Sequence, residues 1–361
     1  SCENEISVVT GIMACNLLDS SRFSVFPVYV SQSGGLFTGE KVLDASAYRG
    51  DISKNFTAAA LIGGRLYAVR GNRLREICVP DCALNCCHGT GGEDGAVPAL
   101  LALNGIASAS PDMAPSALFM DKAETKLVAK ALGVPVLPWM RIGEANYKKR
   151  GAMALRAVEE RLGYPVIVKP VHLGSSIGIS VAEDRARLAF AIEAAFAYDG
   201  VVLAEKYLPE RRDINCACYR SGEELVLSAC EEPKTSHRIL TFADKYLDGG
   251  KERASDLPAK ISAETADRIR SYTKLLYRRT GLRGVVRADF LLSGGEVYFN
   301  EMNTVPGSLA WYLFCKRMAD FTGVLTALIE QGICDGHDAA NKKLLGNCGV
   351  LSSVRGKARR G

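Results

Sequence analysis

The sequence predicts an α/β domain followed by α+β domains, and three observations support this fold class. A chain of 361 residues has room for two or three domains with buried cores. Two glycine-rich loops, His88–Gly95 and Gly174–Gly178, follow short apolar runs of the kind that form buried strands. Near the C-terminal end, Val285–Leu292 and Glu296–Asn303 flank Ser293-Gly294-Gly295, which is the pattern of a β-hairpin.

The first residues predict a helix with no strand before it. Residues 1–7 are polar and resemble a helix cap, and apolar residues then recur at helical spacing at Ile6, Val9, Ile12 and Met13. Because a helix rarely begins an α/β domain, we expect that a first strand and its turn are missing from this sequence.

Buried strands are predicted at four further places: Phe23–Val30, Leu84–Cys87, Pro165–Pro170 and Val201–Ala204. The second of these leads into the glycine-rich loop and then into a helix over Val97–Leu103. Strand, loop and helix in this order are typical of an α/β domain that binds a ligand at its strand ends.

A second helix has clear ends. Asp121 is its predicted N-cap, with Glu124 at the capping-box position, and Gly133 ends it. The following segment Val134–Trp139 contains two prolines and indicates a domain junction. Residues 352–361 are expected to form a flexible tail.

Composition and charge narrow the possible functions. The chain is 48% hydrophobic and 24% charged, an ordinary globular balance. Its 45 basic and 40 acidic residues give a net charge of +5, part of which lies in the last few positions. This small excess suits a polyanionic small molecule such as ATP and argues against nucleic acid as a partner.

The sequence carries no sign of a membrane or secretory protein. No apolar run approaches the ~20 residues of a membrane helix, and nothing at the start resembles a signal peptide. We therefore expect a cytoplasmic protein without a membrane partner, whose twelve cysteines are reduced. The tightest cysteine group lacks a paired C-x-x-C, so buried apolar roles are favoured over a zinc site at Cys78, Cys82, Cys86 and Cys87.

The predicted hairpin carries the sharpest chemical signal. Strand alternation places Arg287 and Asp289 on one face of its first strand, and Phe299, Glu301 and Asn303 on one face of its second. Carboxylate and amide oxygens suit Mg²⁺. The alternative is a solvated face whose charges pair with Arg287, but carboxylates on such apolar strands are costly unless something binds them. A metal site is therefore favoured.

Two further segments suit a nucleotide, although each signal is weak alone. The Gly174–Gly178 loop, with Lys169 before it, offers backbone N–H groups, hydroxyls and an ammonium to phosphate, but lacks the Gly-Lys-Ser/Thr ending of a P-loop. At the end of the Val201–Ala204 strand, Glu205 can accept from the amine of a base. A common turn and an ordinary strand end remain the alternatives.

The first glycine-rich loop contains His88 and Glu93. A ligand-binding loop and a structural turn fit this local pattern equally well. Ser175 could suggest a serine hydrolase, but no Gly-x-Ser-x-Gly elbow surrounds it.

Taken in order, these motifs resemble the D-alanine–D-alanine ligase family over about residues 1 to 330. The matching segments are Ser1–Ser7, His88–Gly95, Ser116-Ala117, Met120-Asp121-Lys122, Val166–Pro170, Gly174–Gly178, Asp244-Lys245-Tyr246, Arg287-Ala288-Asp289 and Asn300–Gly307.

The resemblance implies an ATP-grasp fold with an N-terminal Rossmann-like domain. The expected division is an N-terminal α/β substrate domain (1–115), a central ATP-grasp subdomain (116–207), a C-terminal ATP-grasp subdomain with the metal site (208–335) and a tail (336–361).

It also implies residue roles. ATP would be bound by Lys122, Lys169, Ser176, Glu205, Lys206, Leu208, Asp213 and Lys245. Two Mg²⁺ ions, or Mn²⁺, would be held by Asp289, Glu301 and Asn303. Glu3 would bind the ammonium of the first D-alanine in a network with Ser175 and Tyr246, and Arg287 and the Gly307 N–H would stabilise the oxyanion. His88, Glu93 and Ser308 would complete the substrate site.

The implied activity is ATP-dependent joining of two D-alanines through an acyl phosphate, for peptidoglycan synthesis, by a homodimer. D-serine or D-lactate as acceptor is an alternative, although Tyr246 argues against D-lactate, and so is a non-catalytic ATP-binding relative. Two departures from the family pattern bear on these alternatives: the Ser308–Tyr312 segment is unusual, and Pro209–Asp213 is one residue longer.

Overall fold

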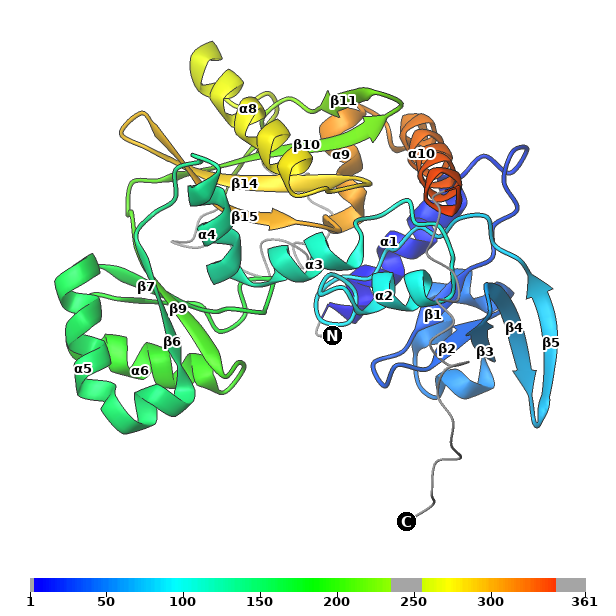
Figure 1. Ribbon diagram of the computed structural model, residues 1–361, viewed down its shortest axis with the longest axis horizontal. Coiled ribbons are helices and arrows are strands. Elements are labelled where there is room, and N and C mark those ends of the chain that lie inside the picture. The colour runs from blue at the N-terminus through cyan, green and yellow to red at the C-terminus, as the bar shows by residue number, and fades with distance from the viewer. Residues whose placement is uncertain (1–2, 235–254, 342–361) are drawn as a thin grey trace, which may run out of the picture.

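The computed structural model describes residues 3–234 and 255–341, which form three sheets with their helices and a small two-stranded ribbon. The N-terminal sheet lies at one end of the molecule. The sheet from the middle of the sequence, residues 139–206, is called the central sheet and lies at the other end, with the C-terminal sheet between the two (Figure 1). No helix among these residues is long and apolar enough to cross a membrane.

The N-terminal part begins with helix α1 (Asn4–Leu17), as predicted. An antiparallel sheet follows in the order β1-β2-β3-β4-β5. Its strands are β1 (Val28–Val30), β2 (Leu36–Thr38), β3 (Thr57–Ile62), β4 (Arg65–Arg70) and β5 (Arg73–Cys78). Three 3₁₀ turns, Glu40–Leu43, Ala45–Tyr48 and Ile52–Lys54, connect β2 to β3.

Two strand predictions in this part need correction. Only the last three residues of Phe23–Val30 are in a strand. The segment Leu84–Cys87 forms no strand, and next to it a single parallel bridge joins Ala83 to Ser108. The physical reason is local, because the N–H of Asn85 donates to Ser110 Oγ and that of Cys87 donates to Asn85 Oδ1. These backbone groups bond side chains in place of a neighbouring strand.

Three helices lead from the glycine-rich loop to the central part: α2 (Ala96–Leu103), α3 (Met113–Met120) and α4 (Lys122–Ala131). The predicted cap of α4 is confirmed, since Asp121 accepts from the N–H groups of Ala123 and Glu124 at 2.8 and 2.9 Å. Gly133, with φ of +78°, follows the helix end as expected.

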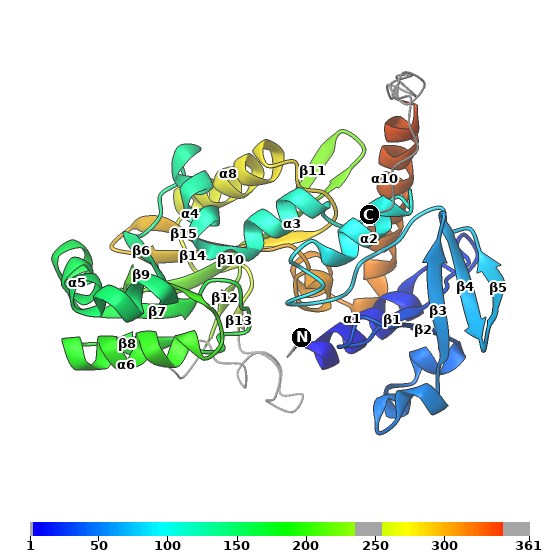
Figure 2. The ribbon, with the colours of Figure 1, turned by 60° about the horizontal axis from the view of Figure 1, so that its bottom comes forward.

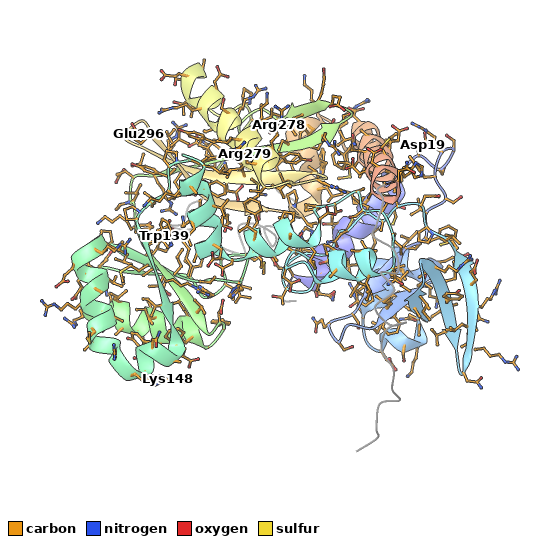
Figure 3. The ribbon with its side chains drawn as sticks, in the orientation of Figure 1. Asp19, Trp139, Lys148, Arg278, Arg279 and Glu296 are labelled. Atoms are coloured by element: carbon orange, nitrogen blue, oxygen red, sulfur yellow. The ribbon has the colours of Figure 1, made fainter. Side chains whose placement is uncertain are left out.

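The central sheet has the antiparallel order β6-β9-β7-β8. Its strands are β6 (Trp139–Gly143), β7 (Val166–Pro170), β8 (Ser180–Ala182) and β9 (Val201–Lys206). Helices α5 (Glu144–Leu162) and α6 (Arg185–Phe196) pack their apolar residues on it (Figure 2). Charged residues such as Lys148 cover their outer side (Figure 3).

The C-terminal sheet has the order β11-β10-β14-β15. Its strands are β10 (Arg212–Ser221), β11 (Glu224–Leu227), β14 (Val286–Ser293) and β15 (Glu296–Asn303). Helix α8 (Ala263–Arg279) covers one face with its apolar side and exposes Arg278 and Arg279 (Figure 3). The ribbon consists of β12 (Glu232–Pro233) and β13 (Ser255–Asp256).

The chain after β15 packs against the N-terminal part. It contains a turn at Gly307–Ala310, helix α9 (Trp311–Phe314), a 3₁₀ turn at Met318–Phe321 and helix α10 (Thr322–Ala340). Apolar residues of α1 and α10 share one core cluster. Helix α1 also lies beside the Gly307–Ala310 turn that follows β15.

The predicted hairpin is confirmed, but its face assignment was wrong at one residue. Asp289 pairs with Glu301, whereas Phe290 pairs with Phe299, so a β-bulge at Asn300 interrupts the alternation. Phe299 is fully buried in the core under α8, while Glu301 and Asn303 point to the other side. A bulge adds one residue to the strand, so the residues before it point to the opposite face from the one that strict alternation predicts.

Candidate active site

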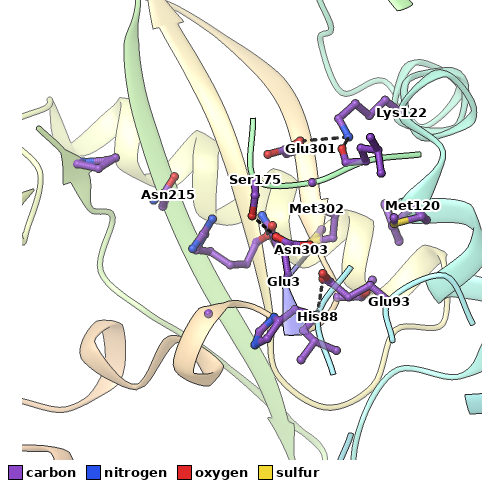
Figure 4. A pocket seen from close by; sticks show the side chains of 18 of the residues that line it. Glu3, His88, Glu93, Met120, Lys122, Ser175, Asn215, Glu301, Met302 and Asn303 are labelled. Atoms are coloured by element: carbon purple, nitrogen blue, oxygen red, sulfur yellow. Dashed lines mark hydrogen bonds and ion pairs between the residues drawn. The ribbon is translucent and has the colours of Figure 1, made fainter. Parts of the chain in front are cut away.

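A pocket lies between the C-terminal sheet, the start of α1, the His88–Gly95 loop and the Gly174–Gly178 loop (Figure 4). Many predicted site residues line it together: Glu3, His88, Glu93, Lys122, Ser175, Arg287, Glu301, Asn303 and Gly307. They come from six separate segments of the chain.

Other predicted residues do not line this pocket: Lys169, Ser176, Glu205, Lys206, Leu208, Asp213, Asp289 and Ser308. Lys206 donates to the Tyr164 carbonyl at 3.1 Å, and Asp213 lies 3.8 Å from Arg211. Asp244, Lys245 and Tyr246 lie outside the described residues.

The three predicted metal ligands are neighbours in the sheet. Asp289 lies directly across from Glu301, and Asn303 Nδ2 donates to Asp289 Oδ2 at 3.0 Å. Glu301 also lies 3.9 Å from Lys122 Nζ. Two carboxylates and an amide on one sheet face form a hard-oxygen donor set, which fits Mg²⁺.

Arg287 pairs with one of these carboxylates. Its Nε and Nη2 donate to the two oxygens of Asp289 at 2.7 and 2.8 Å, and its Nη1 lies 3.3 Å from the Tyr312 hydroxyl. Burial by itself lowers the pKa of Arg287, but Asp289 more than offsets this and raises it well above the ordinary value. The guanidinium is therefore a fixed positive charge at the pocket wall.

Glu3 and Ser175 meet although they are far apart in sequence. The Ser175 hydroxyl donates to Glu3 Oε1 in the buried part of the pocket. Ser175 and Ser176 have φ of +52° and +60°, and a Cβ at Gly174 would lie 3.2 Å from Glu3 Oε2. The glycine therefore allows this loop to approach the Glu3 carboxylate closely.

Glu93 joins two loops of the pocket. Its carboxylate accepts from the N–H of Gly89 at 2.9 Å and from the N–H of Val305 at 3.1 Å. Burial raises the pKa of Glu93, while these two N–H donors act against the rise. The structure thus gives Glu93 a positioning role between the glycine-rich loop and the end of β15.

His88 is a buried member of the pocket lining and is bonded from helix α1. Its Nε2 lies 2.9 Å from Thr10 Oγ1, and its backbone N–H donates to Ser7 Oγ at 2.8 Å. Burial lowers the pKa of the His88 imidazole to about 4, so the ring is neutral near pH 7.

A buried charge cluster lies beside the pocket. Lys169 Nζ contacts Glu205 Oε2 at 2.7 Å and Asn300 Oδ1 at 3.1 Å, and Lys126 forms an ion pair with the other Glu205 oxygen. Burial favours the neutral carboxyl, but the two ammonium groups more than offset it and lower the pKa of Glu205. Two lysines thus face one carboxylate, and burial lowers the pKa of Lys126. An anionic ligand nearby would favour the charged form of both lysines.

Sequence reasoning missed several members of this site: Thr10, Lys126, Glu231 and Asn300. Lys126 had a usable signal, because it follows Lys122 by four residues and so shares a helix face with it. Glu231 is buried on the pocket wall, where it accepts from Asn215 Nδ2 at 3.1 Å.

The two antiparallel sheets, with a glycine-serine loop in one and an acidic hairpin in the other, define an ATP-grasp protein. The family model described as "D-ala D-ala ligase N-terminus" matches residues 1–110, and that described as "D-ala D-ala ligase C-terminus" matches residues 128–333. The chain belongs to the D-alanine–D-alanine ligase family, whose members are ATP-dependent and generally use Mg²⁺.

Individual relatives and solved structures are similar to this chain over most of its length. The D-alanine–D-alanine ligase of Thermosipho melanesiensis is 32% identical over 92% of this chain and 91% of its own. The crystal structure of D-alanine–D-alanine ligase from Helicobacter pylori has a TM-score of 0.75 at 28% identity, covering 91% of this chain and 95% of that one. The VanG D-Ala:D-Ser ligase from Enterococcus faecalis has a TM-score of 0.76 at 26% identity, covering 91% and 96%.

Proposed function

We propose that this chain joins two D-alanines into D-alanyl-D-alanine, at the expense of ATP and for peptidoglycan synthesis. One observation carries the proposal. An acidic group (Glu3), a fixed cation (Arg287) and two members of the hard-oxygen set (Glu301 and Asn303) face the same pocket from three segments of the chain, and the third member, Asp289, lies across from Glu301 in the sheet. That combination can hold an amino acid by its ammonium while its carboxylate faces the phosphate-transfer site.

Glu3 would receive the ammonium of the first D-alanine. Ser175 donates to one Glu3 oxygen and orients the carboxylate, which has further lone pairs for the substrate. Tyr246 would join this network, as predicted from the sequence.

A carboxylate is a poor electrophile, so a carboxylate oxygen of the first D-alanine would attack the γ-phosphorus of ATP, with ADP as the leaving group, and the substrate would become an acyl phosphate. Lys122, on the pocket wall, and Lys169, in the buried cluster, would approach the phosphates, with Lys245 and Ser176 as further donors. Glu205, Lys206, Leu208 and Asp213 would hold the nucleoside, as the family resemblance implies.

Asp289, Glu301 and Asn303 would hold Mg²⁺. From the family pattern we propose two ions, with Mn²⁺ as an alternative to Mg²⁺. When bound, the metal neutralises the charge that spreads over the transferring phosphoryl group. Arg287 remains beside this set and keeps its own charge throughout.

The second D-alanine's amine would attack the acyl carbon of the intermediate and release phosphate. Arg287 and the Gly307 N–H would stabilise the oxyanion, and loss of one such donor typically costs about 10²–10³ in rate. His88, Glu93 and Ser308 would shape the acceptor side, the first two mainly by holding loops in place.

We also propose a cytoplasmic homodimer with no nucleic-acid or membrane partner, divided into residues 1–115, 116–207 and 208–335. Helix α10 continues to Ala340, so residues 336–340 belong to this helix and not to the predicted tail at 336–361. The modest charge excess and the ordinary composition support the choice of partners.

A coupled ADP-release assay tests the proposal, with D-alanine, D-serine, D-lactate and L-alanine offered separately and the products identified by mass. We expect Mg²⁺-dependent ADP release with D-alanine and formation of D-alanyl-D-alanine. Equal turnover in EDTA, or with L-alanine alone, would rule the activity out.

D-serine is the second acceptor to test, because the structural neighbour VanG is as similar in fold as the H. pylori enzyme. A mixed dipeptide formed from D-alanine and D-serine in preference to D-alanyl-D-alanine would reassign the acceptor. Nucleotide binding without any dipeptide would indicate a non-catalytic relative.

A further inference from the structure

Thr10 connects two walls of the pocket from the middle of helix α1. Its side chain is fully buried, and its Oγ1 lies 2.9 Å from His88 Nε2. The same oxygen accepts from the backbone N–H of Ser308 at 3.3 Å. A Thr hydroxyl inside a helix commonly bonds a carbonyl of its own preceding turn. Here it contacts a loop 78 residues away and a turn 298 residues away.

The turn that Thr10 contacts has an unfavourable backbone. Ser308, Leu309 and Ala310 have φ of 49°, 51° and 53°, so three consecutive residues with side chains are left-handed. Left-handed backbone is unfavourable for a residue with a side chain, and such a turn persists only when its surroundings hold it. The bond to Thr10 and the bond from the Leu309 N–H to the Pro306 carbonyl, at 2.8 Å, both act on this turn.

The hydrogen bonds of Thr10 indicate the tautomer of His88. Thr10 Oγ1 already accepts from the Ser308 N–H, so the proton of its own hydroxyl is available to donate to His88 Nε2. A neutral imidazole has one N–H and one lone pair. With Nε2 beside Thr10, the N–H belongs on Nδ1, and Nε2 accepts the hydroxyl proton of Thr10.

We propose that Thr10 is a positioning residue that fixes His88 as the Nδ1–H tautomer and holds the Gly307–Ala310 turn against α1. His88 then links its own loop to α1, because its Nε2 contacts Thr10 and its backbone N–H donates to Ser7. The effect on catalysis rests on the proposed function, in which the Gly307 N–H stabilises the oxyanion and Ser308 shapes the acceptor side.

Thr10→Val tests this with little change of shape, because it replaces the hydroxyl by a methyl group. Thr10→Ser is the matched control, since it keeps the hydroxyl and loses the methyl. We expect Thr10→Val to raise the KM for the second D-alanine about tenfold, the size of effect that loss of one buried hydrogen bond gives. The KM for ATP should change less than twofold, and Thr10→Ser should stay near wild type. A role in core packing alone would make Thr10→Ser the worse variant.

A direct readout needs no turnover. The chain has four histidines, so ¹⁵N-histidine labelling gives few signals, and His88→Asn identifies the one of interest. We expect the Nδ1–H pattern for His88 at pH 7 in the wild type and in Thr10→Ser, and a mixture of tautomers in Thr10→Val. An Nε2–H pattern in the wild-type protein would overturn the proposal, whether or not the Val variant folds. If the protein makes no dipeptide but shows the Nδ1–H pattern, the proposed function fails and the role of Thr10 in holding His88 stands.

Discussion

Lys169 donates from Nζ to Oε2 of Glu205 at 2.7 Å, in a site where both side chains are buried. Each of them was expected to contact ATP directly. In this structure they contact each other, and Lys126 pairs with the remaining Glu205 oxygen. Binding of a nucleotide would therefore have to exchange partners within this cluster. Because Lys126 stays with Glu205, Lys169 can turn to a phosphate without leaving the carboxylate uncompensated.

The cluster predicts unequal effects of removing its members. Glu205→Gln leaves two buried ammonium groups without a carboxylate and should lower the free energy of unfolding by about 3–5 kcal/mol. Lys126→Met leaves one matched ion pair and fills the space of the side chain, so it should cost about 1 kcal/mol or less. Chemical denaturation of both variants measures the difference. Equal losses would mean that the two lysines do not share the carboxylate.

Glu301→Gln should nearly abolish Mg²⁺-dependent turnover and leave the fold intact, because it removes a charge from the hairpin without changing volume. Asp289→Asn should act in the same direction, with the added loss of its pairing to Arg287. Glu296→Gln is the matched control, since Glu296 is an exposed residue at the other end of the same strand. ADP release and Mg²⁺ titration are the measurements. Full activity in both hairpin variants would place the metal elsewhere.

Glu3→Gln should weaken binding of the first D-alanine by about 10–100-fold, the range for a hydrogen bond to a charged group. Glu5→Gln changes an exposed residue in the first turn of α1, two residues after Glu3, so it is the control and should behave as wild type. Both are checked by steady-state kinetics with D-alanine varied at saturating ATP. A variant that raised only the KM for ATP would move Glu3 out of the amino-acid site.

The buried His88 predicts a pH dependence of stability. Its pKa is about 4 in the folded protein, against an ordinary value of 6.5, so between these values the unfolded chain binds more protons. Stability from His88 is therefore complete above pH 6.5 and is lost as the pH falls through 4, by at most roughly 3 kcal/mol. His88→Gln should lack this component of the loss between pH 6.5 and 4.

Thermal unfolding of wild type and His88→Gln at a series of pH values measures the component as a difference between two curves. His337→Gln, which changes an exposed histidine on α10, is the control. Parallel curves for wild type and His88→Gln would contradict the lowered pKa.

Local chemistry made several elements readable from the sequence. The Asp121 cap, the Gly133 end of α4 and the two strands around Ser293-Gly294-Gly295 depend on neighbours within a few residues. The motifs identified the family and contain most of the residues that line the pocket, because each motif keeps its functional residues close together in the chain. The prediction of a strand at Leu84–Cys87 was wrong because it depended on a distant partner. An apolar run becomes a strand only if another strand lies beside it.

The sequence by itself therefore determined the fold class, the family and the kinds of groups that meet in the pocket. Tertiary structure alone decided which of those groups touch. The bulge at Asn300 sends Phe299 to the core and Glu301 to the pocket, although they are two residues apart. Thr10 lies beside Ser308 only because α1 packs against the turn after β15. Such contacts depend on how distant segments pack, and single-chain patterns of period two or 3.6 carry no information about partners 300 residues away.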